Sequence, residues 1–215
     1  MVKKSISEIK ILGVLRTLYP EFGIALKFEN TWQLLVSTIL SAQCTDRQVN
    51  KVTPVLFKKL KTIDDFAKTD LKKLETMVKS TGFYKNKAQN IKNSAKMVLK
   101  RYNGYVPKTM KELTVLPGVA RKTANIVLHS GFGLIEGIAV DTHVKRLSKR
   151  IGLTKEENPV NIEKDLMKIF PKRYWGDVSF LLIMHGRNVC KARKPDCNNC
   201  LLCRFCISCG KMAKK

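Results

Sequence analysis

The residues Thr114–Ala124, TVLPGVARKTA, contain a break between two short helices, and this break is the best guide to the fold. A first helix is expected to end near Val115, because Pro117 and Gly118 do not continue it. A second helix is expected to begin at once and to run through Ala124. Such a turn leaves backbone N–H groups at the new helix start that suit a phosphate. An ordinary helix–turn–helix corner would have the same pattern.

Helical periodicity extends through most of the chain. Apolar residues recur three or four positions apart, as at Val49, Val52 and Leu56, and no comparable alternating series of strand type appears. We therefore predict an all-α fold. Further helices are expected at 159–170 and at about 174–187, and the weakest helical pattern lies at 131–140. The expected caps and stops are Asp46 and a capping box of Thr109 with Glu112 at N-termini, and Gly82, Gly131 and Gly152 at C-termini.

The charge balance points to an anionic partner. The 215 residues include 41 Lys and Arg against 17 Asp and Glu, which gives a net charge of +24. Such an excess is typical of nucleic-acid binding, although a solvated basic surface or attraction to an anionic membrane would also produce it. No apolar stretch approaches the roughly 18 residues of a membrane span, and no signal-peptide run follows the N-terminus. We expect a soluble intracellular protein without a membrane partner.

Lys122 is the candidate nucleophile. It falls in the first turn of the second hairpin helix, where a cation opposes the helix dipole, so this is an unfavourable place for a merely solvating charge. Desolvation, the positive helix end and the adjacent Arg121 would all favour the neutral amine that nucleophilic attack requires.

Asp141 is the candidate acidic partner of Lys122. It follows an apolar run and precedes a predicted helix. A simple helix cap would explain the same position, and capping and catalysis can coexist in one carboxylate. His143 lies close by in sequence, where a structural histidine is an equally good explanation.

A cysteine cluster closes the chain. Six of the seven cysteines fall between positions 190 and 209, and in a reducing compartment such a cluster favours metal over disulfides. The spacing C-x6-C-x2-C-x5-C, compact and undivided, favours one iron–sulfur cubane over a zinc ribbon, which usually has two separated C-x2-C pairs. The cysteines in this spacing are Cys190, Cys197, Cys200 and Cys206.

Three other cysteines lie outside this pattern. Cys203 and Cys209 continue a repeat of one cysteine in every three residues, so they leave the ligand set open and could be oxidation-prone. Cys44 is expected to be a small core residue. In the loop between the first two cluster cysteines, Arg193 and Lys194 are expected to contact the DNA backbone.

Together these motifs resemble the endonuclease III family of helix-hairpin-helix DNA glycosylases. The resemblance rests on L-P-G-V-x-R-K-T-A at 116–124, V-D-T-H-V-x-R at 140–146 and the cysteine spacing, and it covers nearly the whole chain. It implies a 4Fe–4S cluster, and N-glycosylase and apurinic/apyrimidinic lyase activities. Lys122 would attack the anomeric carbon of an oxidised pyrimidine nucleotide and form a Schiff base, and Asp141 would stabilise positive charge on the sugar.

The same resemblance implies a set of DNA contacts. An enzyme that excises a base must flip the nucleotide out of the duplex and fill the gap. Gln43, in the S-A-Q-x-T-D loop, would fill the vacated space, and Phe83 would wedge the opposite strand. The hairpin residues Gly118, Ala120 and Arg121 would contact the backbone. Ala120 departs from the family, which usually has glycine there, so its methyl group could loosen the approach to phosphate.

The resemblance also implies a domain organisation. A six-helix barrel is expected at 24–135, with the hairpin at about 109–131. Residues 1–23 and 136–215 would form a discontinuous cluster domain with the cluster loop at 190–206, and DNA would bind between the two. The expected partner is double-stranded DNA with damaged pyrimidines or abasic sites, bound by a monomer. The enzyme would lie with the nucleoid in a prokaryotic cytoplasm, or in a eukaryotic nucleus.

Two alternatives remain. A monofunctional mismatch glycosylase for adenine or thymine would release the base without cutting the strand, but those relatives lack a lysine equivalent to Lys122. The adenine enzymes also carry a further C-terminal domain. A non-catalytic iron–sulfur protein that binds DNA or transfers electrons would leave both Lys122 and Asp141 without a role.

Overall fold

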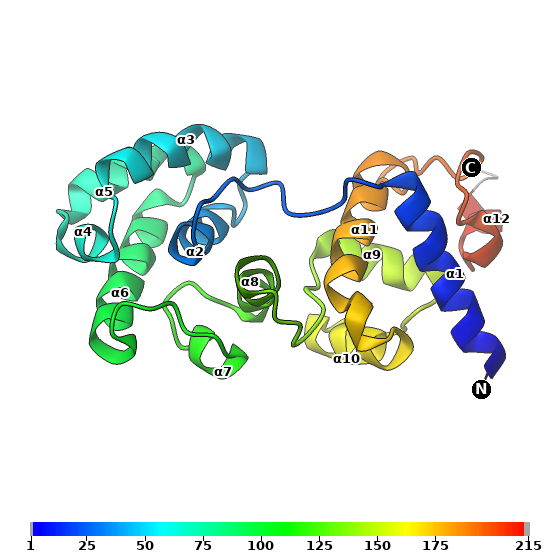
Figure 1. Ribbon diagram of the computed structural model, residues 1–215. Coiled ribbons are helices and arrows are strands. Elements are labelled where there is room, and N and C mark those ends of the chain that lie inside the picture. Colours follow the sequence, from blue (N-terminus) through cyan, green and yellow to red (C-terminus); the bar gives the residue numbers. More distant parts are fainter. Residues whose placement is uncertain (1, 213–215) are drawn as a thin grey trace. The chain divides into compact units, whose positions relative to one another are not determined.

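The computed structural model describes residues 2–212, with side chains from residue 9 to residue 210. Met1 and residues 213–215, which the predicted domain boundaries include, lie outside this range. Within it every regular element is helical and none is a β-strand, so the predicted all-α class is confirmed. The chain divides into two compact units (Figure 1). One comprises Ala25–Glu136, and the other combines the segment up to Ile24 with the segment from Gly137 onward.

The 25–136 unit contains the hairpin. Its elements in chain order are α2 (Thr31–Leu40), α3 (Asp46–Lys59), α4 (Ile63–Lys68), α5 (Leu71–Val78), the 3-10 helix η1 (Lys79–Thr81), α6 (Tyr84–Tyr102), α7 (Met110–Leu113), α8 (Arg121–Ile126) and the π-helical segment η2 (Val127–Gly131).

Helix α2 is the centre of this unit. Every residue from Trp32 to Leu40 is buried, because the helix is apolar on nearly all sides and must be enclosed. Trp32 meets Phe66 of α4 edge to face, with the ring centroids 5.5 Å apart. Helix α6 packs against α4, α5 and α2, so it supports both the core and the hairpin that follows it.

The second unit is built from both ends of the chain. Its elements are α1 (Val2–Leu18), α9 (Thr142–Ile151), α10 (Pro159–Ile169), the 3-10 helix η3 (Lys172–Tyr174), α11 (Trp175–Asn188), the 3-10 helix η4 (Cys203–Phe205) and α12 (Cys209–Met212).

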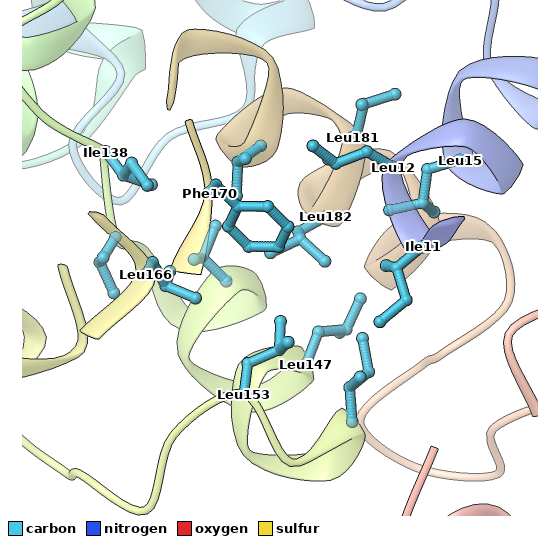
Figure 2. Close-up of a cluster of buried hydrophobic side chains, with 14 of the residues drawn as sticks. Ile11, Leu12, Leu15, Ile138, Leu147, Leu153, Leu166, Phe170, Leu181 and Leu182 are labelled. Atoms are coloured by element: carbon cyan, nitrogen blue, oxygen red, sulfur yellow. The ribbon is translucent and has the colours of Figure 1, made fainter. Parts of the chain in front are cut away.

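One apolar core joins the two ends of the chain (Figure 2). Leu12 and Leu15 of α1 lie in the same buried cluster as Leu147 of α9, Leu181 of α11 and Phe170, the residue that follows α10. Burying a leucine or phenylalanine side chain stabilises a fold by about 1.5–3 kcal/mol. The N-terminal helix is therefore part of the core of the C-terminal unit, which explains why this unit is discontinuous in sequence.

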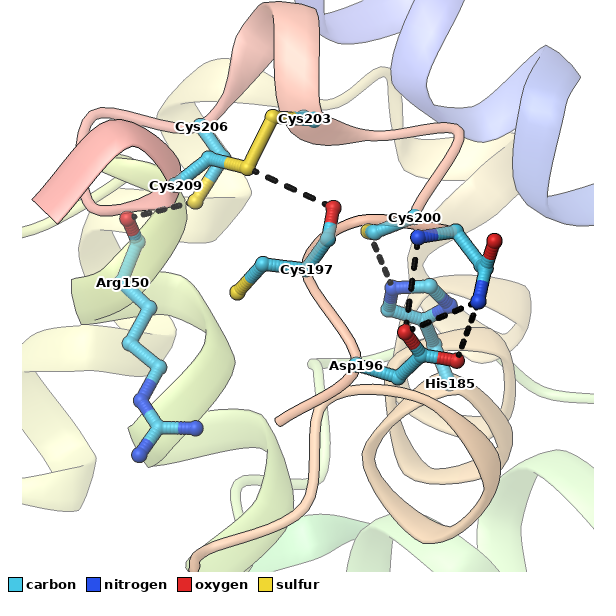
Figure 3. Close-up of a disulfide and its surroundings, with 9 residues drawn as sticks. Arg150, His185, Asp196, Cys197, Cys200, Cys203, Cys206 and Cys209 are labelled. Carbon is cyan, nitrogen blue, oxygen red and sulfur yellow. Dashed lines mark hydrogen bonds between the residues drawn. A yellow bond between two sulfur atoms is a disulfide. The ribbon is translucent and has the colours of Figure 1, made fainter. Parts of the chain in front are cut away.

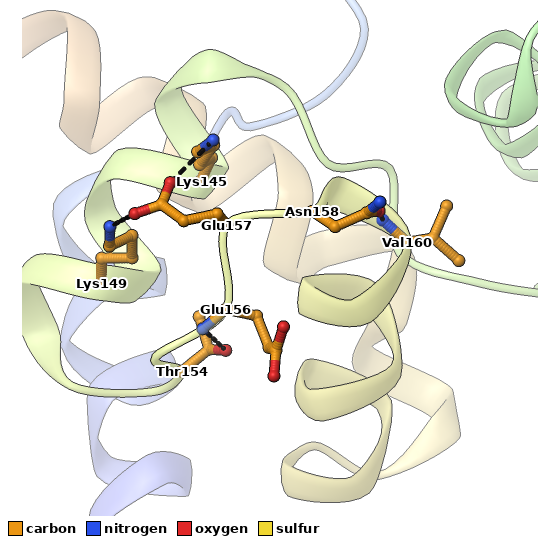
Figure 4. Close-up of polar contacts among 7 residues, drawn as sticks. All are labelled: Lys145, Lys149, Thr154, Glu156, Glu157, Asn158 and Val160. Carbon is orange, nitrogen blue, oxygen red and sulfur yellow. Dashed lines mark hydrogen bonds and ion pairs between the residues drawn. The ribbon is translucent and has the colours of Figure 1, made fainter.

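Polar contacts shape the loop between α9 and α10 (Figure 4). Asn158 accepts a hydrogen bond from the backbone N–H of Val160 at 2.9 Å and so caps α10. The Glu157 carboxylate pairs with Lys145 at 2.9 Å and also with Lys149. Exposed ion pairs of this kind contribute up to about 1 kcal/mol, so the cap is at least as important for the start of α10.

The helix starts differ from the prediction in two places. Thr45, not Asp46, is the N-cap of α3, because its hydroxyl is the group that accepts the Gln48 N–H, at 3.2 Å. Thr109 caps α7 as predicted. The Glu112 carboxylate, however, accepts a hydrogen bond from the Thr109 hydroxyl at 2.8 Å and not from the Thr109 backbone N–H, so the predicted capping box is incomplete.

The helix ends are closer to expectation. Gly82 and Gly152 end their helices with positive φ, at +70° and +96°. Gly131 was expected to be a third stop, but it lies within the π-helical segment, and the positive φ occurs at Gly133 (+68°). The predicted helices near 159–170 and 174–187 and the weak pattern at 131–140 are confirmed. Among the described helices none is long and apolar enough to cross a bilayer.

Candidate active site and cysteine site

The hairpin turn rests on helix α6. The Ser94 hydroxyl donates to the carbonyl oxygen of Pro117 at 2.9 Å. Gly118 has φ +78°, and a Cβ atom added there would lie 2.9 Å from the side-chain nitrogen of Asn90. Glycine is therefore required at this position twice, for its backbone conformation and for the close approach to α6.

The turn delivers Lys122 to the second position of α8. Ala120 is the N-cap, with φ −84° and ψ 169°, an extended conformation that alanine adopts without strain. Because alanine has no side-chain acceptor, it does not cap the first-turn N–H groups of α8. Arg121 and Lys122 are both exposed, and the desolvation expected for Lys122 stays a prediction.

Asp141 caps helix α9. Its Oδ1 atom accepts the backbone N–H groups of His143 and Val144, both at 2.8 Å, so the capping interpretation is confirmed. The side chain is half-buried. Asp141 belongs to the unit from Gly137 onward, whereas Lys122 belongs to the 25–136 unit. The pairing of the two side chains therefore stays a prediction.

His143 has a structural environment. Its Nδ1 lies 3.1 Å from Nη2 of Arg146, and the same guanidinium nitrogen donates to the carbonyl oxygens of Gly186 and Cys190, both at 3.0 Å. Burial lowers the pKa of His143, and the nearby Asp141 carboxylate partly offsets this. The Arg146 bonds join α9 to the end of α11, and His143 lies beside the guanidinium that makes them.

The two residues expected to enter the duplex share an unusual backbone. Gln43 lies in the turn after α2 with φ +52°, and Phe83 lies directly before α6 with φ +47°. Both side chains are exposed, and that of Phe83 is 63% exposed. Without the family resemblance, the position of Phe83 at a helix end would suggest a core contact, but the side chain is exposed. Positive φ is also rare for such a bulky residue.

The four predicted cluster cysteines line one pocket of the second unit. Cys190, Cys197, Cys200 and Cys206 all remain thiols, whereas Cys203 and Cys209 form a disulfide with an S–S distance of 2.01 Å (Figure 3). The expectation that this cluster avoids disulfides is therefore wrong for these two extra cysteines. Cys209 also lines the pocket, but as part of this disulfide and not as a thiol.

The donor set of the pocket is rich in thiols, which are the ligands that iron–sulfur clusters use. In the described part of the chain no three His, Cys, Asp or Glu side chains are placed to hold a metal ion. Burial raises the pKa of Cys197 and Cys200, and the neighbouring thiols add to this effect. Four thiolates would therefore need a bound cationic group to offset their repulsion.

Basic groups surround this pocket. Arg150 Nη1 lies 3.4 Å from Sγ of Cys190 and donates to the Lys191 carbonyl oxygen at 2.7 Å, so it fixes the start of the cysteine loop. His185 Nε2 lies 3.3 Å from Sγ of Cys200 (Figure 3). Arg193 and Lys194, predicted to contact DNA, are both exposed, and Lys194 has φ +50°.

Sequence reasoning misses several of these contributors. Cys44, expected in the core, is instead half-buried in the loop before α3. Lys87 is buried, and it lies four residues before Ile91 on the apolar stripe of α6. A charged residue on a buried stripe was the available signal. Arg150 approaches its cysteine from α9, 40 residues away in sequence, and no local pattern indicates that contact.

Comparison with known proteins extends these observations. Residues 36–172 match the family described as HhH-GPD superfamily base excision DNA repair protein. Endonuclease III of Synechocystis sp. is 49% identical over 208 residues, which is 97% of this chain and 95% of that protein.

Two solved structures are also similar. One is a non-covalent complex of endonuclease III with DNA. Its TM-score is 0.93 at 42% identity, over 98% of this chain and 99% of that chain. The other is a trapped covalent intermediate of endonuclease III with DNA. Its TM-score is 0.90 at 43% identity, over 95% of this chain and 96% of that chain.

Proposed function

Because this chain belongs to the HhH-GPD superfamily of base excision DNA repair proteins, and within it to the endonuclease III family, we propose that it is a bifunctional DNA glycosylase and lyase. Its ligand is double-stranded DNA. Its substrates are oxidised pyrimidine nucleotides and abasic sites, and it acts as a monomer on nucleoid DNA, or on nuclear DNA if the source is eukaryotic.

Lys122 is the nucleophile in this proposal. The observation that carries it is the position of an exposed lysine directly after the Gly118 turn, in a chain similar to a protein trapped as a covalent intermediate with DNA. A covalent bond to DNA requires a nucleophile, and an amine can form a Schiff base with the sugar. Since Lys122 is exposed in the free protein, the desolvation that the reaction needs has to come from the bound DNA.

The neutral Lys122 amine attacks C1′, and the base leaves with the electron pair of the glycosidic bond. The amine loses its protons as the C1′–O4′ bond breaks and O4′ takes up a proton, which leaves the opened sugar as a Schiff base. A proton is then lost from C2′, and the 3′ phosphate leaves with its electron pair, which nicks the strand. Asp141 stabilises the positive charge that develops on the sugar.

The remaining predicted residues support this chemistry. Gln43 and Phe83 fill the duplex after the nucleotide is flipped, and Gly118, Ala120, Arg121, Arg193 and Lys194 contact the backbone. The four pocket thiols, Cys190, Cys197, Cys200 and Cys206, hold a 4Fe–4S cluster. That cluster supplies a cross-link for the basic loop and no step of the reaction.

Borohydride trapping tests the proposal. The protein is incubated with duplex DNA that contains thymine glycol, and reduction should fix a covalent protein–DNA adduct. Lys122→Ala should abolish the adduct, whereas Lys111→Ala, which removes an exposed lysine of α7, should retain it. Base release by the unaltered protein without any adduct would refute the lyase and favour the monofunctional alternative.

A further inference from the structure

Lys87 joins the two loops that carry Gln43 and Phe83. Its side chain is only 4% exposed, although it is charged. The ammonium donates to the carbonyl oxygen of Leu40 at 2.8 Å and to that of Thr81 at 2.7 Å. One buried cation of α6 therefore bridges two segments that are about forty residues apart in the chain.

Both acceptors are the final carbonyls of helices. Leu40 ends α2 and Thr81 ends η1, where backbone carbonyls lack a partner in their own helix and the dipole favours a cation. Burial lowers the pKa of Lys87, and the nearby Cys44 partly offsets this. The two hydrogen bonds are thus what offsets the cost of this buried charge.

Each bond lies at the base of a strained turn. Gln43 follows Leu40 by three residues, and Phe83 follows Thr81 by two. Neither Gln43 nor Phe83 is glycine, yet both have positive φ, a conformation that persists only when surrounding contacts fix it. Lys87 supplies such a contact to both turns at once.

A second bond joins the same two segments. The Gln48 side chain, in the first turns of α3, donates from Nε2 to the Ser80 hydroxyl at 2.9 Å. Gln48 follows the Gln43 turn, and Ser80 precedes the Phe83 turn. The two turns are therefore connected on the surface as well as in the interior.

From this pair of connections we propose that Lys87 is a positioning residue that couples the two turns, so that Gln43 and Phe83 enter the duplex as one rigid element. The inference rests on the proposed function, since it concerns how that enzyme fills the gap left by the flipped nucleotide. Without Lys87 each turn would relax separately. Insertion of the two side chains into the duplex would then become slower, and covalent trapping on the duplex would slow with it.

Three variants test this. Lys87→Met removes the ammonium and keeps most of the side-chain volume. Lys92→Met is the matched control, because Lys92 is also on α6 and its ammonium donates to the carbonyl oxygens of Ala67, at 3.0 Å, and Thr69, at the end of α4. Ser80→Ala removes the surface bond at an exposed position, where loss of folding is not expected.

The readout is a ratio of two trapping rates measured with the holoprotein. One substrate is a duplex with an abasic site, and the other is the same duplex with a gap in place of the opposite nucleotide, where the two turns have no orphan base to displace. Lys87→Met should slow trapping on the duplex by about 10-fold or more and on the gapped substrate by less than about 2-fold. Ser80→Ala should shift the ratio in the same direction by roughly 2- to 5-fold, and Lys92→Met should leave it unchanged.

The outcomes separate the inference from the proposed function. If the unaltered protein forms no adduct with either substrate, the proposed function fails. If it forms the adduct and Lys87→Met keeps the original ratio, coupling by Lys87 is refuted. An equal shift in Lys92→Met would also refute it, because general destabilisation would then explain the effect. If Lys87→Met does not fold, an unchanged ratio in Ser80→Ala refutes the coupling of the two turns.

Discussion

The hydroxyl of Tyr19 lies 3.1 Å from Nδ1 of His185, which ties the segment after α1 to the last turn of α11. The opposite ring nitrogen, Nε2, lies 3.3 Å from Sγ of Cys200. One buried imidazole therefore connects the N-terminal segment, α11 and the cysteine loop. Burial lowers the pKa of His185 to about 4, so the ring is neutral at neutral pH.

This burial predicts a loss of stability in mild acid. The unfolded chain takes up a proton on His185 near pH 6.5, whereas the folded protein does so only near pH 4. Unfolded molecules therefore bind more protons between these values, and the free energy of unfolding should fall by about 2 kcal/mol from pH 7 to pH 5. Urea unfolding should show that His185→Gln loses this part of the slope and that Tyr19→Phe retains it. Equal slopes in His185→Gln and the unaltered protein would contradict the prediction.

The disulfide predicts which cysteines are dispensable for metal. Cys203 and Cys209 are bonded to each other, so Cys209 lines the pocket as a disulfide, whereas Cys197 and Cys200 line it as thiols. The double variant Cys203→Ser with Cys209→Ser should keep its iron and its visible absorption. Cys200→Ser should lose both. Cys44→Ser is the control, since Cys44 lies in the other unit. Loss of iron from the double variant would show that the ligand set includes one of the extra cysteines.

Much of the fold follows from local sequence patterns. The helices near 159–169 and 175–188 have apolar residues at regular spacing and clear stops, so their bounds were predicted to within about a residue or two. The prediction that Gly131 ends a helix was wrong, because the apolar pattern ends there while the chain continues through a π-helical segment to Gly133. Periodicity marks where apolar residues end and does not reveal a change in helix type.

The site was predicted unevenly for a related reason. Motifs that are contiguous in sequence, such as the hairpin around Lys122 and the cap at Asp141, can be interpreted before the structure is known. The bonds of Lys87 to Leu40 and of Arg150 to Cys190 join residues more than 35 positions apart. Such contacts depend on tertiary packing, and a single sequence carries no local pattern for the partner.

The hairpin predicts unequal responses to substitution at its two small residues, Gly118 and Ala120. Gly118→Ala should destabilise the protein by about 1–3 kcal/mol, because φ +78° is unfavourable for alanine and its Cβ would crowd Asn90. It should also weaken binding to abasic DNA. Ala120→Gly should change stability by less than about 1 kcal/mol, since the backbone there is extended. Thermal unfolding and fluorescence anisotropy measure the two effects. A Gly118→Ala protein of unchanged stability would contradict this account.

Asp141 permits its two roles to be separated. Asparagine is as good an N-cap as aspartate, so Asp141→Asn should keep the bonds to His143 and Val144 and change stability by less than about 0.5 kcal/mol. It removes the negative charge that stabilises the sugar cation, so the rate of base release should fall about 100-fold. Asp141→Ala should lose that activity and about 1 kcal/mol of stability as well. Asn158→Ala, which removes the cap of α10, should cost similar stability without affecting the rate. If Asp141→Asn kept the full rate, Asp141 would act only as a cap.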